Sequence, residues 1–119
     1  MLDFKNIAIW QRSHQLTLDI YKATQQFPKE ESFGLTSQIR RAVSSIPTNI
    51  AEGCGRRSNA ELANFLNIAC GSASEVEYEI LLAKEIGYIS PAQCESWTRE
   101  IIEIRSMLAA YMKRLKSEH

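Results

Sequence analysis

Residues 35–58 read LTSQIRRAVSSIPTNIAEGCGRRS, and this stretch decides how the rest of the chain is interpreted. Its apolar residues return every three or four positions, which places them on one face of a helix. We predict a helix from Leu35 to Gly53. Its inner face is formed by Leu35, Ile39, Ala42, Val43, Ile46 and Ile50. The polar side of the same stretch carries an arginine pair near each end.

Pro47 stands in the middle of this predicted helix. A proline has no N–H to donate to the carbonyl four residues earlier, which belongs to Val43, and its ring crowds that carbonyl. The sequence therefore predicts a kink in one continuous helix. The alternative is a true break, at which Ser45 caps a new helix. Gly53 and Gly55 are expected to supply the permissive backbone of the helix exit.

A first helix is expected from about Asn6 to Gln26, after a short lead-in turn. It ends before Phe27-Pro28, because a residue that precedes proline is pushed out of the helical conformation. Its apolar sector is wider than one packed neighbour needs, since a second stripe runs beside the core stripe. This stripe contains Trp10, His14 and Tyr21, and we interpret it as a subunit interface. The alternative is that these side chains complete the core of one chain.

Two further helices follow. Ser58 and Glu61 have the spacing of a capping box, which begins a helix from about Asn59 to Ile86, with Gly87 just past its end. Its apolar stripe is formed by Leu62, Leu66, Ala69, Ala73, Val76, Ile80 and Ala83. Its middle, residues 69–74, consists of six small residues, which would allow a neighbouring helix to approach closely. Ser90 begins the last helix, which runs to about Leu115. With short connections and no credible strand, the prediction is an all-α, antiparallel up-down-up-down four-helix bundle, with residues 1–119 as one domain.

Composition limits the functions that can be considered. Lys plus Arg and Asp plus Glu both number 14, so the chain has no overall charge to attract a polyanion. The three cysteines are widely spaced and indicate neither a zinc site nor a disulfide framework. No stretch approaches the length of a membrane span. We therefore expect a soluble cytoplasmic protein that needs no metal and no cofactor.

A catalytic site is not indicated. His14 and His119 are the only histidines, and no phosphate loop or metalloprotease motif is present. Three carboxylates, Glu75, Glu77 and Glu79, occupy alternate positions, so a helix would scatter them on a solvated or interface side. We therefore expect a protein that is not an enzyme.

Basic side chains are the best candidates for contact with nucleic acid, because guanidinium groups bind phosphate through two parallel hydrogen bonds. The residues predicted for this role are Arg40, Arg41, Arg56, Arg57, Lys113 and Arg114. The alternative is that they complement helix C-termini or form ion pairs between subunits.

Several segments resemble one known family over most of the chain. They include GLTSQIRRA at residues 34–42, SIPTNIAEG at residues 45–53 and ACGS at residues 69–72. The family is named for proteins encoded by intervening sequences in bacterial 23S ribosomal RNA genes. The accessory variability determinant of diversity-generating retroelements looks like a relative. The resemblance implies a four-helix bundle without enzyme activity that assembles as a ring, typically a homopentamer.

The resemblance also suggests partners and polar positions. The retroelement relative binds nucleic acid and a reverse transcriptase, so RNA, DNA or such an enzyme are candidate partners here. Gln38, Asn49 and Glu52 match the family's polar set, and Asn49 or Glu52 is expected to satisfy the carbonyl freed by Pro47 or to pair with an arginine of a neighbouring subunit. We therefore predict an oligomeric scaffold or accessory for RNA or nucleoprotein. The alternative is an oligomeric adaptor that binds only protein.

Overall fold

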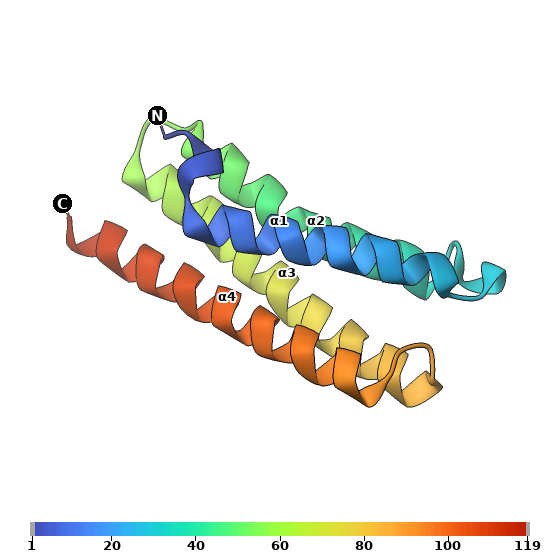
Figure 1. The fold of residues 1–119 in the computed structure, drawn as a ribbon. Coiled ribbons are helices and arrows are strands. Elements are labelled where there is room, and N and C mark those ends of the chain that lie inside the picture. The colour runs from blue at the N-terminus through green and yellow to red at the C-terminus, as the bar shows by residue number, and fades with distance from the viewer. Residues whose placement is uncertain (1, 119) are drawn as a thin grey trace.

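The computed structural model describes residues 2–118, which form four long helices in a rod of 48 × 22 × 20 Å (Figure 1). The helices are α1 (Ala8–Ala23), α2 (Leu35–Cys54), α3 (Asn59–Ile86) and α4 (Pro91–Ser117). Each helix runs antiparallel to the one before it, and residues 2–118 contain no strand. The predicted all-α four-helix bundle is confirmed. His119, the second histidine, lies outside the described residues.

The core consists of one apolar stripe from each helix, at the spacing that the sequence shows. Ile20, Ile46, Leu66 and Ile104 are fully buried representatives of the four stripes. Contacts run from α1 to α2, from α2 to α3, from α3 to α4 and from α4 back to α1. The helices therefore form a closed square, in which the α1–α2 side lies opposite the α3–α4 side.

The first helix is shorter than predicted at both ends. Residues Phe4–Asn6 form a separate 3₁₀ turn, and the carboxylate of Asp3 caps it by accepting from the backbone N–H of Lys5 at 3.1 Å. At the other end the last turn tightens into a 3₁₀ segment, Thr24–Gln26, before Phe27-Pro28. Helix ends commonly tighten in this way, and local periodicity does not distinguish the two helix types.

Helix α2 is continuous through Pro47, as predicted, so the alternative of a break with Ser45 as the cap of a new helix is wrong. The hydroxyl of Thr17 on α1 lies 3.2 Å from the Val43 carbonyl that Pro47 leaves without a partner, and 2.7 Å from the carbonyl of Ser13. One hydroxyl proton therefore serves both carbonyls. Asn49 and Glu52 were expected to satisfy this carbonyl or to pair with an arginine of a neighbouring subunit. Within the described chain they contact Ser45 and Arg56 instead. A side chain of the neighbouring helix replaces the missing backbone donor, which allows the helix to continue.

The glycines act differently from the sequence-based expectation. Gly53 lies inside α2, where an added Cβ would come within 2.8 Å of the Leu62 side chain on α3. Gly55 has a φ of −83°, which any residue can adopt. Gly53 therefore permits α2 and α3 to approach closely, and neither glycine supplies an unusual backbone conformation at the end of α2. Gly71 faces open space, so the expectation that it admits a neighbouring helix is wrong. Gly87, with a φ of 96°, ends α3 as predicted.

Two serines start the last two helices. The Ser58 hydroxyl accepts from the backbone N–H of Glu61 at 3.1 Å and donates to the Glu61 carboxylate at 3.2 Å, so only half of the predicted box forms. The Ser90 box is complete, because Gln93 also accepts from the Ser90 backbone N–H at 3.3 Å. These caps make α3 and α4 begin where the sequence places them.

Candidate functional site

The end of α2, the start of α3 and the end of α4 lie at the same end of the rod (Figure 1). These segments carry several basic residues, and we call this part of the rod the basic end. Its cations are Lys5, Arg56, Arg57, Lys113, Arg114 and Lys116. Its carboxylates are Asp3, Glu52, Glu61 and Glu118. The chain is neutral as a whole, so the cations in excess at this end are balanced by carboxylates elsewhere along the rod. Four of the six predicted nucleic-acid-contact residues lie here.

Arg40 makes its contacts within the same chain, at the C-terminal end of α1. Its Nε donates to the Thr24 hydroxyl at 2.8 Å, and its Nη2 donates to the Tyr21 carbonyl at 3.0 Å. The guanidinium also lies 4.9 Å from the centre of the Tyr21 ring. Arg40 thus supplies donors to the C-terminal end of α1, where carbonyls lack helical partners and the helix dipole favours a cation.

Arg41 lies on the side of α2 that faces α3, and Arg56 lies just beyond the end of α2. Arg41 is exposed, and its charge opposes the rise in the pKa of the Glu79 carboxyl on α3. Arg56 pairs with Glu52 at 3.0 Å and lies 4.9 Å from the centre of the Phe65 ring. Glu52 therefore pairs with an arginine of its own chain, four residues later in the connection that follows α2.

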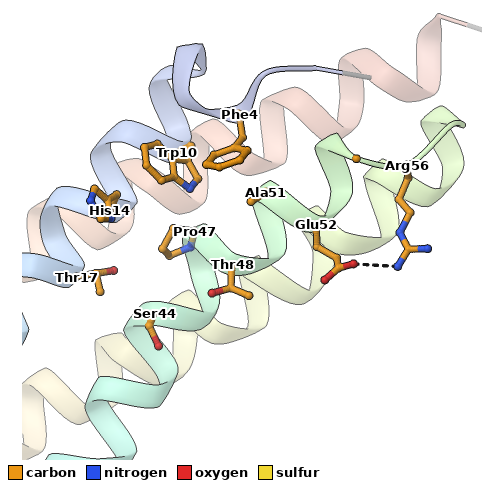
Figure 2. Close-up of a pocket in the computed structure, with 11 residues that line it drawn as sticks. Phe4, Trp10, His14, Thr17, Ser44, Pro47, Thr48, Ala51, Glu52 and Arg56 are labelled. Atoms are coloured by element: carbon orange, nitrogen blue, oxygen red, sulfur yellow. Dashed lines mark hydrogen bonds and ion pairs between the residues drawn. The ribbon is translucent and has the colours of Figure 1, made fainter.

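Trp10 and His14 line a groove between α1 and α2, together with Phe4, Pro47 and Thr48 (Figure 2). The groove has a volume of about 790 Å³. The Trp10 and His14 rings are stacked, with centres 4.7 Å apart and an angle of 11° between their planes. We call this surface the Trp10 groove. Tyr21, the third predicted interface residue, is 40% exposed and lies further along α1, against Arg40.

A second apolar surface lies between α3 and α4, over a groove of about 860 Å³. Its most exposed apolar side chains are Tyr78, Leu81 and Ile102, at 61%, 44% and 45% exposure. We call it the Tyr78 strip. This strip was not predicted from the sequence, because its residues flank the core stripes of α3 and α4 without forming a stripe of their own. Their apolar character at positions outside the core spacing is the signal that could have identified them.

The predicted polar positions on α2 have local roles. Asn49 donates to the Ser45 carbonyl at 2.8 Å and lies 2.9 Å from the Ser45 hydroxyl. Ser72 on α3 donates to the same hydroxyl at 2.9 Å, which ties α2 to α3. Gln38 is exposed.

Glu79 departs from the expectation of a solvated carboxylate. It is only 3% exposed, and its Oε1 accepts no hydrogen bond from residues 2–118. Burial, followed by the negative charge of Glu75, raises the pKa of the Glu79 carboxyl to about 7. Its spacing from Val76 and Ala83, three and four residues away, places it on the edge of the core stripe, and this is the signal that the sequence offered.

Within residues 2–118 no group of three or more His, Cys, Asp or Glu side chains is placed to hold a metal ion. None of the described helices combines the length and apolar character that a membrane crossing requires.

These features define an all-α, four-helix-bundle protein with a basic end and two uncovered apolar surfaces. The family model for the 23S rRNA-intervening sequence protein matches residues 5–110, and the chain belongs to this family. No curated protein sequence matches the chain. The relation to the retroelement determinant stays a prediction.

The fold is similar to a solved structure. It is the crystal structure of a protein of unknown function from the S23 ribosomal protein family of Bacteroides thetaiotaomicron. The two chains are 31% identical, with a TM-score of 0.80, and the match covers 89% of this chain and 99% of the other.

Proposed function

We propose that this protein is a non-enzymatic homo-oligomer, a pentamer as the family resemblance implies, that serves as a scaffold or accessory for RNA or nucleoprotein in the cytoplasm. The observation that carries the proposal is the pair of apolar surfaces on opposite sides of one bundle. The Trp10 groove lies on the α1–α2 side, and the Tyr78 strip lies on the α3–α4 side. Apolar and aromatic side chains that are left uncovered around a groove are common at protein interfaces.

Two different surfaces that cover each other produce a head-to-tail contact, and such contacts close into a ring when the rotation between neighbours is suitable. The Trp10 groove is concave, and the Tyr78 strip offers the aromatic and aliphatic side chains that fill such grooves at interfaces. We therefore propose that the strip of one copy packs into the groove of the next. Arg56 and Glu52 lie at the rim of the groove, whereas Arg57, Lys113 and Arg114 of the basic end line neither surface and are free to meet an RNA phosphate.

Light scattering coupled to size-exclusion chromatography tests the oligomer. We expect the wild-type chain to be a multimer and the double variant Leu81→Glu, Ile102→Glu to be a folded monomer, because buried carboxylates without partners are costly. Leu18→Glu is the matched control, since Leu18 is 49% exposed and lines neither surface. A wild-type chain that is monomeric at micromolar concentration refutes the proposal of a ring.

Electrophoretic mobility shift over a salt series tests the contact with RNA. Phosphate contacts release counterions, so the affinity should fall steeply as salt rises. An oligomer that shifts no RNA at low salt contradicts this half of the proposal and favours the adaptor that binds only protein. Arg40, which is hydrogen-bonded inside the chain, is expected to contribute little to any shift.

A further inference from the structure

A cavity of about 300 Å³ opens at the basic end, between the end of α2, the start of α3 and the end of α4. Cys54, Leu62 and Leu115 are buried residues of its lining and give it an apolar floor. Arg56 and Arg57 line it from the α2–α3 connection, and Arg114 lines it from α4. Segments that are far apart in sequence thus bring three guanidinium groups to one hollow.

Two of these arginines have unused hydrogen-bonding capacity. Arg57 is exposed and makes no ion pair or side-chain hydrogen bond with residues 2–118. Arg114 lies 4.7 Å from the centre of the Tyr111 ring, and its hydrogen bond to the Tyr111 side chain opposes the rise in the pKa of that phenol. A guanidinium has five N–H donors, so others stay available to a ligand. Arg56 is the exception, because it is already paired with Glu52.

The surroundings do not neutralise these arginines. Glu118 is the one carboxylate among the described residues that line the cavity. The C-termini of α2 and α4 each contribute about half a negative charge, and the N-terminus of α3 contributes about half a positive one. Glu52 neutralises Arg56, so Arg57 and Arg114 exceed Glu118 by one unit of charge, and the helix ends remove only about half of that excess. The cavity therefore keeps an excess of positive charge and donors, which suits a compact anion with several acceptor oxygens.

We infer that this cavity is a phosphate-binding site, and that its ligand is a phosphate group of RNA, either at a chain end or within a strand. The inference rests on the proposed function for its RNA source. Arg57 and Arg114 supply N–H pairs in the planar arrangement that matches two phosphate oxygens. Arg114 lies beyond residues 5–110, which the family model matches, so the site depends on a part of this chain that the family assignment does not describe.

Titration with inorganic phosphate tests the cavity without RNA. Backbone amide resonances of residues 57–61 in the full chain should shift and reach saturation. The double variant Arg57→Gln, Arg114→Gln should lose this response while its far-ultraviolet circular dichroism stays unchanged, since both side chains are exposed. The variant Arg57→Lys, Arg114→Lys keeps the charge and should recover only part of the response, because lysine cannot form the paired contact. Phosphate shifts that never saturate in the wild-type chain overturn the inference.

RNA binding tests the source of the phosphate. We expect the Gln double variant to bind a single-stranded oligoribonucleotide about tenfold more weakly, with a salt slope about 0.7 lower in magnitude, which corresponds to one lost phosphate contact. The control removes two exposed positive charges at the opposite end of the rod, Lys22→Gln with Lys29→Gln, and should bind like wild type. A 5′-phosphorylated RNA that binds more tightly than its 5′-hydroxyl form identifies a chain-end phosphate, and equal binding identifies one within the strand.

The two proposals fail in different ways. Wild-type RNA binding that the Gln double variant retains in full overturns the phosphate site and leaves the proposed function standing. A wild-type chain that binds no RNA at low salt contradicts the RNA half of the proposed function and the RNA source inferred here. The phosphate titration then still decides whether the cavity binds an anion.

Discussion

Replacing Glu79 with glutamine should change how the stability of the bundle depends on pH. The carboxyl of Glu79 is 3% exposed, and burial is the first cause that raises its pKa from an ordinary 4.5 to about 7. The negative charge of Glu75 raises the pKa further, and the positive charge of Arg41 opposes the rise. A folded chain therefore keeps a proton on Glu79 over a range of pH in which the unfolded chain has already released it.

The sign of the effect follows from this difference in bound protons. Protonated Glu79 contributes its full stability below pH 4.5, and the contribution is lost as the pH rises through about 7. One pKa unit corresponds to about 1.4 kcal/mol, so the whole contribution is about 3 kcal/mol. Most of it, about 2.5 kcal/mol, is lost between about pH 5 and pH 8.5.

Glutamine has nearly the same shape and stays neutral, so Glu79→Gln removes this titration. Urea unfolding of both proteins should give similar free energies of unfolding near pH 5. The variant should be more stable by about 2–3 kcal/mol at pH 8.5. Glu85→Gln, on the exposed side of the same helix, controls for the loss of one negative charge. A stability difference between wild type and Glu79→Gln that does not change with pH contradicts the raised pKa of Glu79. Glu75→Gln should weaken the pH dependence of the free energy of unfolding, because it removes one cause of the raised pKa of Glu79.

Three further substitutions test the packing around α2 and α3, with the free energy of unfolding as the measurement. Thr17→Val should cost about 1–2 kcal/mol, because it removes the donor to the Val43 carbonyl. The loss should be smaller in a Pro47→Ala background, where the backbone of residue 47 regains its N–H. Equal losses in both backgrounds contradict the role given to the Thr17 hydroxyl. Gly53→Ala should cost about 1–3 kcal/mol, since its Cβ would lie 2.8 Å from a side chain of α3, and a fully stable variant would show that the approach is less close. Gly71→Ala has open space around it and should stabilise α3 by about 0.5–1 kcal/mol; a loss of stability would mean that this face is covered.

Features that depend on local spacing were predicted well. The stripe on α3 and the bounds Asn59–Ile86 agree with the sequence-based prediction, as does the exit at Gly87. These features follow from side chains three or four positions apart and from caps within one turn, so they are encoded in short windows of sequence.

Features that depend on how two helices cross were not predicted. The Thr17 hydroxyl reaches the Val43 carbonyl across 26 positions, and Arg40 reaches Thr24 across 16. Gly53 is required by a side chain of the next helix rather than by its own backbone conformation. Periodicity identifies which face of a helix is apolar, but it does not give the register of two helices along their axes. The roles of these polar and small residues could not be derived until that register was known.

The neutral net charge of the chain argues less strongly against binding of a polyanion than the sequence alone suggests. Charges in solution at physiological ionic strength are screened over about 8 Å. The rod is 48 Å long, so a phosphate at the basic end responds to the local excess of arginine and lysine and hardly at all to carboxylates at the far end. A neutral chain of this shape can therefore bind a polyanion at one end. Binding should then depend on a few close contacts, without the long-range attraction that accelerates association for strongly basic proteins. Substitution of arginines at the basic end should therefore raise the dissociation rate of the polyanion more than it lowers the association rate.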